Sequence, residues 1–234
     1  MLYTKKYLFL LSSFFVCTNF YNAHAKQFIH QPQSWNSVQL IGPITSSEKW
    51  SYFFKEEARF DLHDEHVFDE SITDWAICYD ALAYLRCCLG TSIVVSTKEN
   101  PDEVTKEQRF WPEITWRAKQ TDRYKIISRT RLEIRNNFAR SGVALRFRQK
   151  VIVHFLNDSR RIHPFWYDEL FINLKKPAWI TRNTVDQNRF FIGVKVKHNA
   201  ILSWELGYLN QIKFGDSANL MNHVGIFAIN ITIP

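Results

Sequence analysis

Residues 124–135 read YKIISRTRLEIR, and this stretch decides the fold. One alternate set is mostly charged and consists of Lys125, Ile127, Arg129, Arg131, Glu133 and Arg135. The other set is mostly apolar and consists of Tyr124, Ile126, Ser128, Thr130, Leu132 and Ile134. A helix would mix the two sets, because its neighbouring side chains are three or four residues apart, whereas a β-strand alternates between two faces. The stretch therefore predicts a strand with one charged and one apolar face.

The same alternation recurs along the chain. Residues 52–60, 145–151 and 189–197 place most of their charged side chains at alternate positions, with Glu56 as an exception. We expect strands at residues 34–41, 50–60, 72–82, 84–95, 108–118, 124–135, 142–154, 163–174, 188–197, 201–211 and 223–233. Most are about ten residues long, as a tilted membrane-crossing strand requires, whereas strands of soluble sheets usually have about five or six. The chain is therefore expected to be all-β.

The expected connections differ in length. Those at residues 61–71, 96–107 and 175–187 are long and polar, whereas those after the third, fifth and ninth strands are short. Outer-membrane barrels have short periplasmic turns and longer outer loops. With the C-terminus in the periplasm, an upward strand must precede residue 34, so we expect a weak first strand within residues 26–32. The prediction is an antiparallel up-and-down transmembrane β-barrel of about twelve strands, within a range of roughly ten to twelve.

The N-terminus has the pattern of a secretory signal. Lys5 and Lys6 precede an apolar run at residues 7–16, and Ala23-His24-Ala25 is a small-x-small cleavage site. We therefore expect residues 1–25 to be a cleaved signal peptide and residues 26–234 to form the barrel domain. The rest of the chain has no apolar stretch of about 18 residues, which excludes helical membrane spans and leaves a barrel as the structure that satisfies its backbone in lipid.

Six segments also resemble a known family, the uncharacterised barrel proteins grouped as domain of unknown function 2490. The resemblance covers roughly Trp35 to Thr232 and is carried by residues 57–59 (EAR), 107–111 (EQRFW), 129–135 (RTRLEIR), 167–171 (YDELF), 188–193 (NRFFIG) and 205–209 (ELGYL). It implies a barrel in the outer membrane of a Gram-negative bacterium, with no known activity, substrate or catalytic residue. The expected partners are outer-membrane lipid and the barrel assembly machinery, although Pro234 replaces the terminal aromatic common in such barrels.

The charged face must point into the lumen if the apolar face meets lipid, because a Lys or Arg facing the bilayer midplane costs about 2–4 kcal/mol. Alternation places fifteen cations and seven anions inside, a surplus of eight. The residues that we predict to line the lumen are Arg59, Arg109, Arg129, Arg131, Glu133, Arg135, Arg146, Arg148, Lys150, Glu169, Arg189 and Lys195. A narrow lumen with this surplus attracts anions. We therefore expect a narrow, anion-preferring pore for small acidic solutes.

Three other interpretations stay open. Carboxylates that pair with neighbouring arginines would close the lumen and leave a structural barrel. A lipid-modifying enzyme of the outer membrane would need a Ser, a His and a third polar group. The candidate residues are His154, His163, Ser159 and Asp168, or His66, Asp64 and Ser71. Neither set forms a recognisable motif, so we expect no enzyme. A soluble periplasmic binding barrel would instead turn its apolar face inward and its charges outward.

Three cysteines follow residue 25, so at most one disulfide can form within the chain. A three-residue turn at residues 82–84 would pair Cys78 with Cys88 on the inner face, whereas a change of register by one residue would pair Cys78 with Cys87. None of the three has metal-site spacing, and no basic cluster lies beside a nucleic-acid-binding motif. We therefore expect no metal, no cofactor and no nucleic-acid partner.

Overall fold

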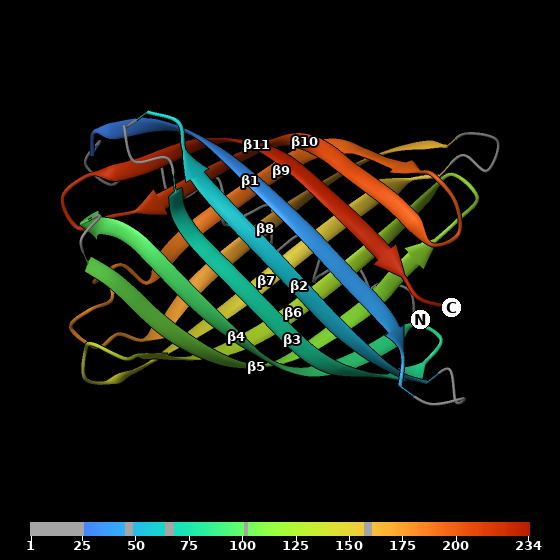
Figure 1. The fold of residues 1–234 in the computed structure, drawn as a ribbon, viewed down its shortest axis with the longest axis horizontal. Helices are drawn as coiled ribbons and strands as arrows, with labels where there is room; N and C mark the ends of the chain where they lie inside the picture. The colour runs from blue at the N-terminus through green and yellow to red at the C-terminus, as the bar shows by residue number, and fades with distance from the viewer. Residues whose placement is uncertain (1–25, 45–48, 64–67, 101–102, 157–160) are drawn as a thin grey trace, which may run out of the picture.

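Eleven strands form one closed barrel in the computed structural model, which describes residues 26–44, 49–63, 68–100, 103–156 and 161–234 (Figure 1). The strands are β1 (Phe28–Pro43), β2 (Trp50–Asp61), β3 (Phe68–Leu82), β4 (Leu85–Asn100), β5 (Glu103–Gln120), β6 (Tyr124–Asn137), β7 (Val143–Phe155), β8 (Ile162–Lys175), β9 (Val185–Lys197), β10 (Leu202–Phe214) and β11 (Asn219–Thr232). The described residues include no helix long and apolar enough to cross a membrane. The signal peptide expected at residues 1–25 lies outside the described residues.

Each strand pairs antiparallel with the next, but the barrel closes through a parallel pair, β1 with β11. The predicted all-β barrel is confirmed, whereas the predicted twelfth strand is wrong. Residues 28–32, which were expected in a separate first strand, begin β1 and pair with β11 from Phe28 onward. Pro32 lies where the pairing of β1 with β2 begins, and its carbonyl accepts a hydrogen bond of 3.0 Å from Leu62 N, so it serves there as an acceptor only.

Several strands are longer than predicted. β4 continues to Asn100 and β5 begins at Glu103, so most of the expected loop at residues 96–107 is a strand hairpin. At the end where β1 begins, here called the N-terminal end, the connections are residues 62–67, 101–102, 138–142, 176–184 and 215–218. At the end where β11 finishes, the C-terminal end, they are residues 44–49, 83–84, 121–123, 156–161 and 198–201. Loop length therefore does not distinguish the two ends, contrary to the prediction.

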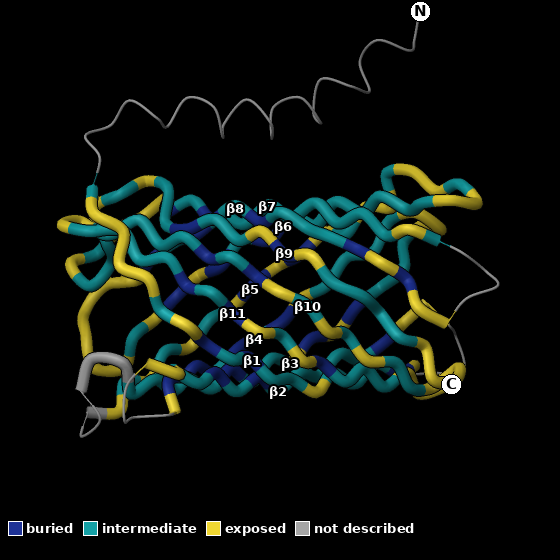
Figure 2. The backbone as a smooth tube through the Cα atoms, turned by 90° about the horizontal axis from the view of Figure 1, so that it is seen from above, coloured by how far each residue is buried: buried dark blue, intermediate teal, exposed yellow. Residues whose placement is uncertain are grey.

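Buried and exposed residues alternate along the strands (Figure 2). The outer face carries large exposed apolar side chains in the middle of strands, such as Ile77, Leu89 and Ile192 at 54%, 53% and 56% exposure. The inner face carries most of the charges. Asp168 is an outward-facing carboxylate and accepts a hydrogen bond of 2.8 Å from Asn188. This arrangement is the opposite of the soluble-barrel interpretation, which required the charges outside.

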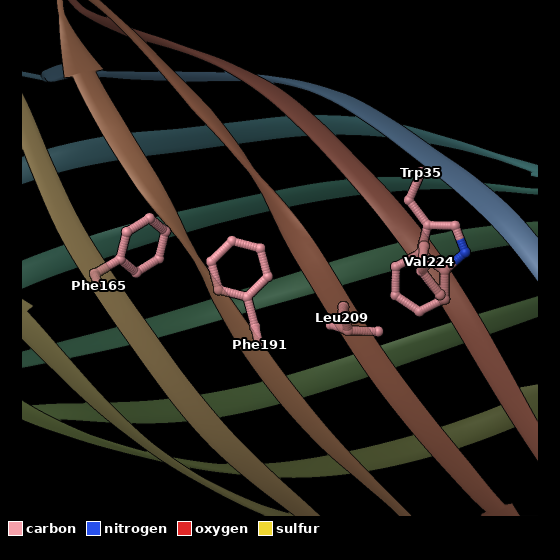
Figure 3. Close-up of a cluster of buried hydrophobic side chains, with 5 residues drawn as sticks. All are labelled: Trp35, Phe165, Phe191, Leu209 and Val224. Atoms are coloured by element: carbon pink, nitrogen blue, oxygen red, sulfur yellow. The ribbon is translucent and has the colours of Figure 1, made fainter.

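The aromatic residues divide between the two faces. Trp50, Phe110 and Tyr208 are 44%, 46% and 43% exposed, whereas Trp35 and Trp111 are buried inside at 5% and 1%. Trp111 lies two residues from Arg109 on β5, and Trp35 is paired with Arg59 of β2, so both point inward with these arginines. Figure 3 shows the inner apolar cluster, whose members come from β1, β8, β9, β10 and β11 and are Trp35, Phe165, Phe191, Leu209 and Val224.

The predicted Cys78–Cys88 alternative is confirmed. The two residues lie directly opposite each other on β3 and β4, and their sulfurs form a disulfide. Cys87 has the opposite parity and a free thiol. The pairing fixes the register of this hairpin because a shift by one residue would turn one cysteine outward.

Candidate functional site in the lumen

A cavity of about 470 Å³ occupies the lumen. Its lining extends toward the C-terminal end, as far as Ile41 on β1 and Asn230 on β11. Ten of the twelve residues predicted to line the lumen line this cavity, namely Arg59, Arg109, Arg129, Arg131, Glu133, Arg146, Arg148, Lys150, Glu169 and Arg189. The other two lie beyond it. Arg135 pairs with Glu107 toward the N-terminal end, and Lys195 pairs with Glu205 at 3.2 Å toward the C-terminal end.

Two buried carboxylates organise the arginines of β6 and β7. Glu133 is 1% exposed and pairs with Arg146 at 2.6 Å and with Arg148 at 2.5 Å. Glu169 is 2% exposed and pairs with Arg129 at 2.8 Å and with Arg148 at 2.7 Å. Arg148 thus joins both carboxylates. Such pairing is what keeps charges stable away from water, and it is the arrangement that the closed-lumen interpretation expected.

The cation surplus in the lumen is smaller than predicted. Four acidic residues that were placed in loops lie on the longer strands and turn inward: Asp69, Glu70, Glu107 and Asp186. Glu70 pairs with Arg59 at 2.6 Å, and Asp186 pairs with Arg146 at 2.8 Å. These four carboxylates offset four of the eight cations in the predicted surplus. Alternation assigned the faces correctly, but the error in strand length left out these anions.

Beside Glu133 and Glu169 the cavity surface is nevertheless cationic, because the arginines that pair with these two carboxylates are more exposed than the carboxylates. The side chain of Arg129 is 23% exposed, against 2% for its partner Glu169. Lys55 is 26% exposed, against 11% for Glu57. A solute in the cavity therefore meets mainly guanidinium and ammonium groups.

Two lining cations, Lys150 and Arg189, have no carboxylate within ion-pair distance among the described residues. The ammonium nitrogen of Lys150 lies 3.3 Å from the ring centroid of Tyr167. The guanidinium of Arg189 lies 4.9 Å from the ring centroid of Trp35, and the oxygen of the Gln211 carboxamide accepts from its Nε at 3.1 Å when turned toward it. Aromatic faces and a neutral amide stabilise these cations without neutralising them.

Part of the cavity wall is apolar. Phe191, Ile152 and Ile226 line it beside Tyr167. Phe191 and Ile152 lie two residues from inward-facing cations on their own strands, so alternation alone turns them inward. The cavity therefore combines a cationic lining, densest on β6 and β7, with an apolar wall whose side chains come from β7, β8, β9 and β11.

A buried amide cluster lies on the N-terminal side of the cavity. Its members are Gln33, Gln187, Gln211 and Asn222, which are 3%, 5%, 0% and 0% exposed. The Asn222 amide donates to Gln33 at 3.1 Å, and the carboxamides of Asn222 and Gln211 are 2.9 Å apart. Gln187 hydrogen-bonds Gln211, so the cluster joins four consecutive strands around the closing seam. None of these four residues lines the cavity, so the cavity ends below them.

The connection at residues 176–184 lies above the amide cluster and is here called the strap. Trp179 donates its indole N–H to Gly142 O at 2.9 Å, in the turn between β6 and β7. Thr181 hydrogen-bonds Asp216 at 3.0 Å, in the turn between β10 and β11. The strap therefore links the turns on either side of it at the N-terminal end of the barrel.

Two of the candidates for hydrolytic chemistry, His163 and Asp168, do not come together. His163 is buried on the inner face of β8, whereas Asp168 has the opposite parity and faces outward. Ser159, Asp64 and His66 lie outside the described residues. In the described part of the chain, no group of three or more His, Cys, Asp or Glu side chains is placed to hold a metal ion.

The fold and site define a closed β-barrel with a buried ion network and a cavity in its lumen. The chain belongs to the family described as "Protein of unknown function (DUF2490)", which matches residues 32–222. An uncharacterised protein of Methylorubrum extorquens is 33% identical over 112 residues, which are 47% of this chain and 49% of that protein, so the match spans about half of each. The siderophore receptor PirA of Pseudomonas aeruginosa matches 73% of this chain and 32% of its own, with 11% identity and a TM-score of 0.27, too low to carry an argument.

Proposed function

We propose that this protein is an outer-membrane β-barrel whose lumen is a one-ended chamber for a small acidic solute with an apolar part. The membrane location is supported by the outer face, where exposed apolar side chains extend around the strands. Soluble monomers rarely expose apolar patches of more than a few hundred Å², and a closed barrel satisfies its backbone groups in lipid.

The chamber is supported by one observation above all: Lys150 and Arg189 line the cavity without carboxylate partners among the described residues, while neighbouring arginines cover theirs. Cations gathered in a low-dielectric cavity attract an anion, which would complete their pairing. The apolar wall around Phe191 offers a surface for a hydrocarbon or ring on the same solute. The amide cluster and the strap favour binding over free passage.

Location is tested by fractionating cells that produce the full chain. Recovery with outer membranes, and release only by detergent, is the expected result. Recovery in the soluble periplasmic fraction would contradict the membrane part of the proposal.

Binding is tested by calorimetric titration of the purified barrel in detergent with benzoate and with citrate. Benzoate combines a carboxylate with an apolar ring, whereas citrate carries charge alone, so benzoate is expected to bind tighter. The paired variant Lys150→Gln and Arg189→Gln should weaken binding at least about tenfold, the equivalent of about 1.4 kcal/mol. The control is Lys195→Gln, which removes one positive charge from a residue that does not line the cavity. Equal binding by all variants, or no binding by the unmodified barrel, would contradict the chamber.

A further inference from the structure

Three side chains meet on the outer face at the closing seam of the barrel. They come from the consecutive strands β10, β11 and β1, and they are Tyr208, His223 and His30. His30 Nδ1 lies 2.9 Å from His223 Nε2, and Tyr208 Oη lies 2.6 Å from His223 Nδ1. The imidazole rings are stacked at 9° with centroids 5.2 Å apart. The cluster faces away from the lumen and takes no part in the proposed chamber.

The ring nitrogens are arranged as in a metal site. When Tyr208 Oη accepts the Nδ1–H of His223, the Nε2 lone pair of that ring points at His30 Nδ1. A hydrogen bond to the far nitrogen is how a metal-binding histidine is usually fixed in its tautomer. Imidazole suits zinc, copper and nickel, with bonds to zinc of about 2.0–2.1 Å. Two such bonds at a tetrahedral angle hold the nitrogens roughly 3.3 Å apart. The present spacing is 2.9 Å, so binding requires both rings to turn until their lone pairs meet on the ion.

Space for the remaining ligands exists next to the pair. Gly225, the next outward-facing residue of β11, has nothing within 4 Å of the position where a Cβ would lie. His30 is exposed and is the third residue of β1, close to the N-terminal rim, so water at the membrane interface reaches the site. Two histidines and water make an exchangeable site rather than a closed structural one.

We propose that His30 and His223 bind one divalent transition-metal ion, of the zinc, copper or nickel class, with Tyr208 orienting His223. The ion would join the first strand to the last, across the parallel pair that closes the barrel. It would therefore stabilise the seam, because a ligand that binds only the folded barrel shifts the unfolding equilibrium toward it.

The test is calorimetric titration of the refolded barrel with Zn²⁺, in a Cys87→Ser background because a free thiol also binds zinc. The expected result is one zinc ion per chain and a rise in unfolding temperature that EDTA reverses. His30→Gln and His223→Gln should each remove both effects. Tyr208→Phe should weaken binding about tenfold or more, as loss of an orienting partner does.

His198→Gln is the matched control, because His198 is exposed and stacks on Trp204 near the other end of the barrel. Circular dichroism without metal checks that each variant keeps its strands. Zinc binding that survives in both variants of the pair would overturn the proposal. So would an unmodified barrel that binds no zinc.

Discussion

Glu133 holds the arginines of two strands and is almost fully buried. Replacing Glu133 with Gln leaves Arg146 and Arg148 short of a countercharge, and breaking a buried ion pair costs about 3–5 kcal/mol. We expect that loss in the free energy of unfolding, measured by denaturant titration in detergent. Glu205→Gln, at a pair whose side chains are 25–30% exposed, should cost at most about 1 kcal/mol. Equal losses would show that burial does not set the strength of these pairs.

Gly207 and Gly193 face each other on β10 and β9, beneath the ring of Phe191. A Cβ on Gly207 would lie 2.4 Å from the tip of that ring and 2.5 Å from Ile192 O, so Gly207→Ala must push the ring away. Overpacking of this kind costs about 1–3 kcal/mol. Gly225→Ala is the control, because its Cβ would enter open space. Thermal unfolding should separate the two variants, and similar midpoints would contradict the packing argument.

At the scale of strands, the alternation of charged and apolar residues predicts which face of the barrel a side chain lies on. It predicts less well where a strand ends and which strand it pairs with. It identified a segment of each of the eleven strands and turned the lumen arginines inward, because side-chain direction depends only on local parity. It could not show that Glu107 and Asp186 belong to strands, since strand ends depend on pairing between neighbours. The parallel closure of β1 on β11 is also a contact between the ends of the chain. The sequence held no local signal for it.

The hairpin of β3 and β4 provides a check of register. With Cys78 opposite Cys88, mass spectrometry of the unreduced protein should find these two joined and Cys87 free. Reduction should lower stability by about 2–3 kcal/mol, the range for a short loop closed by a disulfide. A Cys78–Cys87 bond would shift the hairpin by one residue and turn its charged face outward. The control is Cys87→Ser, which should leave the unreduced stability unchanged.

At the scale of the whole molecule, the lumen has a cationic lining, an apolar wall and, at the N-terminal end, the amide cluster and the strap, which we propose to cover that end. This arrangement has features of two of the sequence-based interpretations, the anion pore and the closed structural barrel. Pairing by Glu133 and Glu169 closes much of the ion network, as a closed barrel requires. Lys150 and Arg189, which have no carboxylate partner among the described residues, are the basis for the anion preference that we propose.

We expect the amide cluster to decide whether the barrel conducts. The cluster is buried and bridges four strands on the N-terminal side of the cavity, so the unmodified barrel should give little or no current in a planar bilayer. Replacing Gln33, Gln211 and Asn222 together with Ala removes the bridging amides and should open a path past the cations. Chloride should carry most of this current, because cationic walls attract anions. Under a salt gradient, the reversal potential should therefore shift toward the equilibrium potential of chloride. Gln39→Ala, a cavity-lining amide toward the C-terminal end, is the control and should stay silent. Steady current through the unmodified barrel would contradict the covered end, and cation preference in the triple variant would contradict the assignment of charge to the walls.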